Sequence, residues 1–139
     1  NKEIIAYQRP TNSGSQTGLL SLVMKGLPVK ESKESEVIET MAGIIEYVSN
    51  YENGDSAIGY SYYYYANVMY KSDDLKYIAV NGIAPTYETI QNGKYPLLTN
   101  YYIVTRKNET NENVSKLKDA MLSDRGQGVA TEAGYVPIS

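Results

Sequence analysis

The clearest pattern of apolar and polar positions lies between residues 35 and 49. Apolar side chains recur there at the three- and four-residue spacing of a helix: Val37, Ile38, Met41, Ile44, Ile45 and Val48. Ser35 precedes them as a candidate N-cap, and Glu36 suits the first turn of a helix. The pattern therefore predicts an amphipathic helix that begins next to Ser35 and buries one stripe. Asn53-Gly54 predicts a turn after it.

Shorter patterns fill the rest of the chain. Apolar runs predict strands, and helical spacing with Gly or Pro stops predicts helices. The expected strands are residues 3–8, 56–60, 76–80 and 97–105. The expected helices are residues 15–25, a helix or turn at 62–70, a short helix at 84–91 with Thr86 or Thr89 as its cap, and helices at 114–121 and 124–134. This order predicts an α/β fold with a mixed, mostly parallel sheet flanked by helices.

Composition narrows the classes of function. The 139 residues include 13 basic and 16 acidic side chains, which gives a net charge of −3 and argues against a broad nucleic-acid interface. The sequence has no His and no Cys. Zinc sites of the usual kind, thiol nucleophiles and His-based triads are therefore excluded within this chain, and no metal or cofactor is expected. No signal peptide and no apolar run of membrane-spanning length is present, so any targeting segment is expected upstream of Asn1.

One loop carries candidate binding chemistry. Residues 9–17 connect the first predicted strand to the first predicted helix. A helix start offers free backbone N–H groups and the positive end of the helix dipole. Arg9 adds a permanently charged, forked donor, Ser13 and Ser15 add hydroxyl groups, and Gly14 allows close backbone approach. These features predict an oxyanion cradle.

The same residues have a simpler explanation. Ser, Asn and Gly are the residues that any helix N-cap and its preceding turn use, so Ser13 or Ser15 would then only cap the helix. Taken alone, the loop favours capping over anion binding. Both interpretations are compatible, because a capping residue can also donate to a ligand.

Several segments together resemble the PstS family, the phosphate-binding subunits of bacterial phosphate ABC importers, which have the type II periplasmic-binding-protein fold. The matching segments occur in the family's order and span nearly the whole chain. They are Arg9-x-x-x-Ser13-Gly14-Ser15, residues 57–60 (Ala-Ile-Gly-Tyr), residues 80–86 (Val-Asn-Gly-Ile-Ala-Pro-Thr), residues 92–97 (Asn-Gly-Lys-Tyr-Pro-Leu), residues 123–127 (Ser-Asp-Arg-Gly-Gln) and residues 134–137 (Gly-Tyr-Val-Pro).

The resemblance implies a non-catalytic receptor for inorganic phosphate. Carried over by motif, the phosphate ligands in this chain are Arg9, Ser13, Gly14 and Ser15. With the family added, anion binding is favoured over capping alone. Many family members have an acidic residue between the Arg and the Ser that holds the Arg side chain, and this sequence has Thr11 there. How Arg9 is oriented is therefore an open question.

The resemblance also implies an incomplete clamp. Residues 1–139 correspond to the C-terminal portion of a two-lobed protein, with the second lobe at about residues 5–100 and helices within 112–139 packing on the missing N-terminal lobe. The implied partners are phosphate, that lobe and an ABC permease in the membrane, with no nucleic acid. The implied location is extracytoplasmic, either periplasmic or as a cell-surface lipoprotein of a Gram-positive bacterium.

Two alternatives stay open. The same fold could bind another oxyanion such as sulfate, molybdate or tungstate, since selectivity would depend on groups of the other lobe. The second alternative is an enzyme acting on phosphate esters with catalytic groups upstream of this chain. The absence of His, Cys and a clear paired-carboxylate motif argues against it.

Overall fold

The computed structural model describes residues 3–50 and 56–138, so the turn predicted at Asn53-Gly54 lies outside the described residues. The chain divides into two compact units, residues 1–77 and residues 78–139. The fold class is α/β with a small parallel sheet, as the sequence predicts.

The sheet of the first unit pairs β1 (Ile5–Ala6) with β2 (Ala57–Ile58). The two strands are parallel, with Ile5 opposite Ala57 and Ala6 opposite Ile58. Beyond β1, Gln8 forms a parallel bridge with Val37. Two backbone hydrogen bonds hold this bridge: Gln8 N–H donates to Glu36 O over 2.9 Å, and Ile38 N–H donates to Gln8 O over 2.8 Å. Two extended segments, β2 and the one around Val37, therefore lie beside the first predicted strand.

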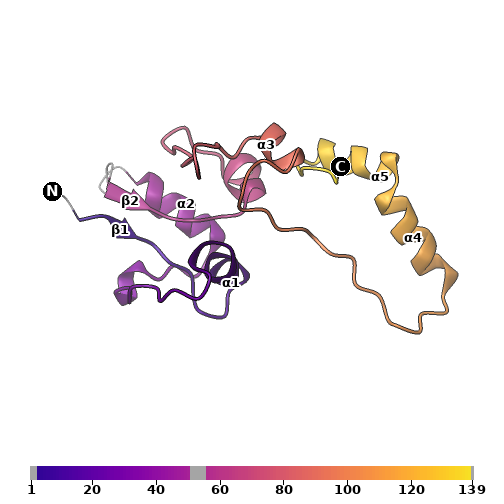
Figure 1. The fold of residues 1–139 in the computed structure, drawn as a ribbon, viewed down its shortest axis with the longest axis horizontal. Helices are drawn as coiled ribbons and strands as arrows, with labels where there is room; N and C mark the ends of the chain where they lie inside the picture. Colours follow the sequence, from indigo (N-terminus) through magenta and orange to yellow (C-terminus); the bar gives the residue numbers. More distant parts are fainter. Residues whose placement is uncertain (1–2, 51–55, 139) are drawn as a thin grey trace. The chain divides into compact units, whose positions relative to one another are not determined.

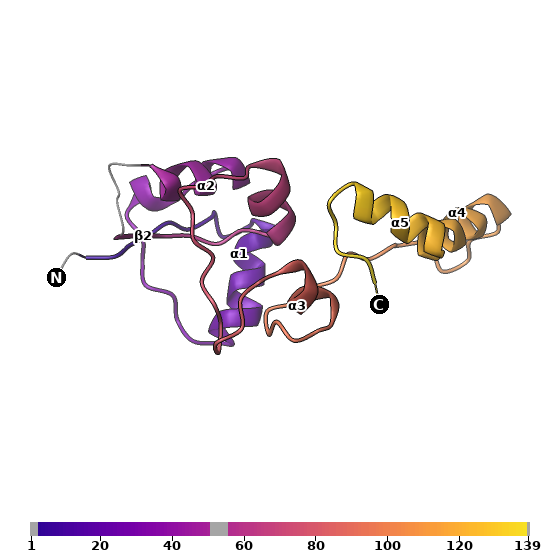
Figure 2. The same ribbon diagram turned by 90° about the horizontal axis from the view of Figure 1, so that it is seen from above.

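Helices α1, η1 and η4 belong to the first unit (Figures 1 and 2). Helix α1 (Gly14–Gly18) continues as the wider-wound helix η1 (Leu19–Met24) and ends where Lys25 (φ 48°) and Gly26 (φ 90°) turn left-handed. This confirms the predicted helix and its stop at Gly26. Tyr65–Met69 form a second wide helix, η4, within the tyrosine-rich stretch.

Helix α2 (Met41–Ser49) runs alongside β2 and supplies Ile44 and Ile45 to the core (Figures 1 and 2). Ile44 is 2% exposed and packs with Tyr7 and Ile38. The predicted start at Ser35 is wrong. Glu34–Glu36 form only a short 3₁₀ turn, η2, and Thr40 caps α2 by accepting from Gly43 N–H over 2.9 Å. Ile38 is buried as predicted, but from an extended segment, because its N–H is taken by Gln8.

The described residues of the second unit, 78–138, form a tight turn, three helices and extended chain. Asn81 (φ 53°) and Gly82 (φ 80°) make the turn, across which Val80 and Ile83 exchange backbone hydrogen bonds of 3.0 Å. Helix α3 (Tyr87–Gln91) starts at the predicted cap Thr86 and is followed by Gly93 (φ 72°). Helices α4 (Glu112–Leu122) and α5 (Asp124–Glu132) pack on each other.

The strands predicted at residues 76–80 and 97–105 do not form in the described chain. Val80 makes a single bridge, and residues 98–105 have no regular structure. Tyr102 is 78% exposed and Val104 is 89% exposed. A strand exists only when a neighbouring strand satisfies its backbone groups, and the described residues provide none for this segment.

Candidate functional site

The candidate site begins at Arg9, just past the end of β1. Its guanidinium group is part-buried and makes two hydrogen bonds. Nη1 donates to Ile38 O over 2.7 Å, and Nε donates to Ser15 Oγ over 3.3 Å. Arg9 and Ser15, predicted to act together, are therefore in direct contact.

The Arg9 guanidinium is held by an uncharged group, the backbone carbonyl of Ile38, and not by an acidic side chain. Thr11, which lies between Arg9 and Ser13 in the sequence, is exposed. A carboxylate partner would neutralise the guanidinium, whereas a carbonyl and a hydroxyl orient it and leave its charge uncompensated. Within the described part of the chain no carboxylate forms an ion pair with Arg9. The Ile38 carbonyl and the Ser15 hydroxyl therefore orient the Arg9 guanidinium and leave its positive charge available to a ligand.

Ser13 caps helix α1, as the simpler interpretation of the loop predicted. Its backbone is extended (φ −80°, ψ 146°), and its Oγ accepts from Gln16 N–H over 3.2 Å. A serine hydroxyl has one proton and two lone pairs. Because this bond uses a lone pair only, Ser13 can still donate its proton to another oxygen.

Two backbone donors stand beside these hydroxyl groups. The N–H groups of Gly14 and Ser15 belong to the first turn of α1, ahead of the first intrahelical bond. Neither donates to any residue in ranges 3–50 and 56–138. Gly14 is exposed, and Ser15 is 8% exposed. One charge, two hydroxyl groups and two amides thus gather at one helix start, which is donor chemistry suited to an oxyanion.

Sequence reasoning missed Tyr60, which follows β2 and anchors this loop. Its hydroxyl accepts from the Arg9 backbone N–H over 2.8 Å and donates to Gln16 Oε1. Burial raises the pKa of Tyr60, and this effect outweighs the opposite effect of Arg9. A signal existed, because residues that follow two paired parallel strands emerge at the same edge of a sheet.

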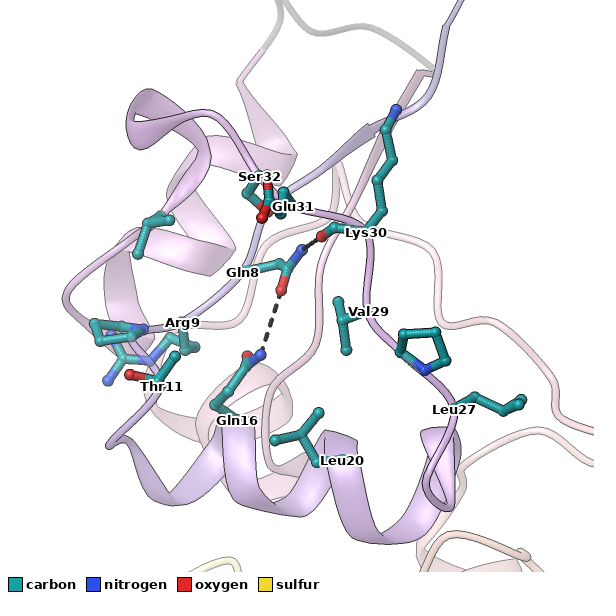
Figure 3. Close-up of a pocket in the computed structure, with 13 residues that line it drawn as sticks. Gln8, Arg9, Thr11, Gln16, Leu20, Leu27, Val29, Lys30, Glu31 and Ser32 are labelled. Carbon is teal, nitrogen blue, oxygen red and sulfur yellow. Dashed lines mark hydrogen bonds between the residues drawn. The ribbon is translucent and has the colours of Figure 1, made fainter.

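A hollow of about 410 Å³ lies next to the loop (Figure 3). Arg9, Thr11 and Gln16 line it from the loop and α1, and residues 27–32 close it on the other side. Across it, Gln16 Nε2 donates to Gln8 Oε1 over 3.3 Å, and Gln8 Nε2 donates to Lys30 O over 3.0 Å. The amides of Gln8 and Gln16 thereby connect α1 to the opposite wall.

The described part of the chain contains no group of three or more acidic side chains arranged to hold a metal ion, and the sequence has no His or Cys. None of the helices in ranges 3–50 and 56–138 has the length and apolar character needed to cross a bilayer.

Comparisons with known proteins agree with the resemblance noted in the sequence. The family model of the PBP superfamily domain matches residues 1–131. The "Phosphate-binding protein PstS" of Borreliella burgdorferi is 29% identical over 136 residues, covering 94% of this chain and 47% of that protein. The protein of the same name from Staphylococcus saprophyticus is 28% identical over 140 residues, covering 99% and 42%.

A solved structure shows the same similarity in three dimensions. The crystal structure of PstS from Borrelia burgdorferi aligns with a TM-score of 0.70 and 28% identity, covering all of this chain and 55% of that one. The chain spans about half the length of the relatives that it matches.

Proposed function

The chain belongs to the PBP superfamily, and from this membership we propose that it supplies one half of an inorganic phosphate site in a non-catalytic solute receptor. The observation that carries the proposal is the contact between Arg9 and Ser15 at the start of α1, with the Arg9 charge uncompensated. The names of the relatives, phosphate-binding proteins, support phosphate as the ligand.

In this proposal each group has a defined role. The Arg9 guanidinium supplies positive charge, and the hydroxyl groups of Ser13 and Ser15 donate to two oxygens of the anion. The backbone N–H of Gly14 and that of Ser15 donate along the helix axis. Binding removes water from the site, which strengthens each of these electrostatic contacts.

The proposal also assigns the chain a place in a larger molecule. Residues 5–100 would form most of one lobe, and helices within 112–139 would pack on an N-terminal lobe that lies outside this sequence. Support comes from the length of the relatives and from exposed apolar side chains of the second unit, among them Leu117 (63%) and Val129 (60%). The receptor would be extracytoplasmic and would deliver phosphate to an ABC permease.

A second candidate ligand has one observation in its favour. None of Arg9, Ser13, Gly14 and Ser15 is a carboxylate, the acceptor that would best recognise the proton of hydrogen phosphate. A set without a carboxylate would equally suit sulfate or another fully ionised oxyanion. Selectivity in the proposed receptor would therefore depend on the other lobe.

Calorimetric titration of the complete polypeptide with phosphate and with sulfate tests this function. We expect phosphate binding that Arg9→Ala weakens by roughly 10- to 100-fold, since a hydrogen bond to a charged group contributes about 1.5–3 kcal/mol. Arg106→Ala, at an exposed position of the second unit, is the matched control and should bind normally. Absence of phosphate binding, or an Arg9→Ala affinity equal to that of wild type, would refute the proposal. Tighter sulfate binding would favour the second candidate.

A further inference from the structure

Tyr60 joins three separate segments through one hydroxyl group. It follows β2, accepts from the backbone N–H of Arg9 over 2.8 Å and donates to Gln16 Oε1 in α1. A tyrosine hydroxyl has one proton to donate, and here Gln16 takes it. The hydroxyl therefore both accepts and donates, and its position fixes the Arg9 backbone relative to the first turns of α1.

Gln16 extends this arrangement into the hollow beside the loop. The residue is 4% exposed, so its amide depends on protein partners rather than on water. Its Nε2 donates to Gln8 Oε1 over 3.3 Å, and Gln8 Nε2 donates in turn to Lys30 O (Figure 3). Tyr60 donates to Gln16, Gln16 donates to Gln8, and Gln8 donates to the Lys30 carbonyl. Each side-chain amide therefore satisfies its partners in only one orientation.

These bonds act on the Arg9 side chain indirectly. The guanidinium reaches Ser15 Oγ only if the Arg9 backbone and the first turn of α1 keep their separation. Ser15 is next to Gln16, and Tyr60 holds both Gln16 and the Arg9 backbone. The Ile38 carbonyl fixes the far side of the guanidinium over 2.7 Å. Without the Tyr60 hydroxyl, one buried acceptor and one backbone donor would lose their partner.

We propose that Tyr60, acting through Gln16, is a positioning residue that holds the Arg9 guanidinium against Ser15 in the geometry for binding the anion. The inference rests on the proposed phosphate site, but its geometric part can be measured without any ligand. Tyr60 does not contact the anion in this arrangement. It fixes the position of the Arg9 guanidinium.

The test uses the complete polypeptide and the variant Tyr60→Phe, which removes the hydroxyl and keeps the ring. The first readout is the hydrogen exchange rate of the Arg9 Nε–H group, followed by NMR without ligand. We expect exchange to become about tenfold faster, since a lost hydrogen bond shifts such an equilibrium by about this factor. Tyr65→Phe is the matched control, because within the described chain the Tyr65 ring makes aromatic contacts but its hydroxyl forms no hydrogen bond.

The second readout is phosphate affinity in a double-mutant cycle. Tyr60→Phe should raise the Kd for phosphate about tenfold in the wild-type background and less than twofold in the Arg9→Ala background, because the positioned group is then gone. A merely structural role would weaken binding equally in both backgrounds. Gln16→Met, of similar length but without the amide oxygen that accepts from Tyr60, should reproduce the effect of Tyr60→Phe on exchange.

The outcomes separate this inference from the proposed function. Wild-type protein that fails to bind phosphate refutes the function, and the Arg9 exchange rate then decides the positioning role alone. Unchanged Arg9 exchange in both Tyr60→Phe and Gln16→Met overturns the inference. A tenfold loss of affinity that persists in the Arg9→Ala background overturns it as well.

Discussion

Arg9 has a permanent positive charge next to oxygen atoms that have no charge. The Ile38 carbonyl and the Ser15 hydroxyl orient the guanidinium, but neither neutralises it. Partial burial of the guanidinium costs free energy because the cation loses hydration, and a bound anion would offset this cost. The arrangement is therefore more favourable with an anion present than without one.

The Tyr60 hydroxyl makes the free energy of unfolding depend on pH in the alkaline range. Burial raises the pKa of Tyr60 in the folded chain above its unfolded value near 10. Between the two pKa values the unfolded chain has released the proton and the folded chain has kept it, so the free energy of unfolding falls as pH rises above about 10. Urea unfolding of wild type should show this decline, and Tyr60→Phe should show a smaller one. Parallel declines in the two proteins would contradict the assignment.

Gly59 lies where the core leaves no room for a side chain. A Cβ added there would lie 2.8 Å from Val48 Cγ2 and 2.9 Å from Ile44 Cγ2. Gly59→Ala should therefore lower the free energy of unfolding by about 1–3 kcal/mol.

Gly18→Ala provides the control for this change within the same unit. Its added methyl would meet Tyr62 Oη at 3.7 Å, an ordinary contact, and Ala favours helix over Gly by roughly 0.5–1 kcal/mol. Chemical denaturation should show Gly18→Ala at least as stable as wild type. Equal destabilisation by both variants would mean that crowding at Gly59 is not the cause.

The sequence alone predicts part of the candidate site. Arg9, Ser13 and Ser15 lie within one short loop, and local patterns of charge, hydroxyl groups and glycine are visible without a fold. Tyr60 and Ile38 contact Arg9 from 51 and 29 positions away. Their roles depend on the pairing of β1 with β2 and on the bridge at Gln8, which no local pattern specifies.

At the scale of elements, the start of α2 offers a direct comparison of two candidate caps. Thr40 accepts from Gly43 N–H, whereas Ser35 lies in the exposed turn η2. Thr40→Ala should lower the free energy of unfolding by about 1 kcal/mol, and Ser35→Ala should change it little. Thermal unfolding followed by circular dichroism measures both. A larger loss from Ser35→Ala would show that the helix starts where the sequence pattern placed it.

The difference at α2 has a physical cause. Helical periodicity correctly predicts that Ile38 and Ile44 are buried, at 7% and 2% exposure, but Val37 of the same predicted stripe is 36% exposed. The apolar periodicity does not reveal that Glu36 and Ile38 form backbone hydrogen bonds with Gln8, which is far away in sequence. Tertiary pairing therefore overrode local helix preference in residues 36–38.

The extended segment at residues 97–105 shows the opposite case. Its composition favours a strand, but the described residues contain no neighbouring strand for it. Strand propensity describes how well a residue fits a half-buried sheet surface, and it cannot create the partner. The helix predictions for α3, α4 and α5 were less affected, because their backbone bonds and caps at Thr86, Asn111 and Ser123 are local.

At the scale of the whole molecule, the second unit exposes apolar surface that soluble proteins usually cover. Val104 is 89% exposed and Tyr102 is 78% exposed, in a segment with strand composition. Surfaces of this kind pair with other chains. Light scattering of the isolated 139-residue chain should therefore report a mass above its 15.5 kDa monomer.

Two variants test whether the exposed apolar segment causes this association. Val104→Lys should reduce it by placing a charge on the apolar segment, while Thr105→Lys adds the same charge at the neighbouring polar position and should reduce it less. A monomer at all concentrations, or equal effects of the two variants, would contradict this account of the exposed segment.

The central claim is that an oxyanion binds at the start of α1. The most direct measurement is an NMR titration of the complete, ¹⁵N-labelled polypeptide with phosphate. We predict the largest shift changes at the backbone N–H groups of Gly14 and Ser15 and at Arg9 Nε. The start of α5 serves as an internal control, because Ser123 caps it in the same way but Asp124 repels anions. Saturable phosphate binding that leaves Gly14, Ser15 and Arg9 unshifted would contradict the account.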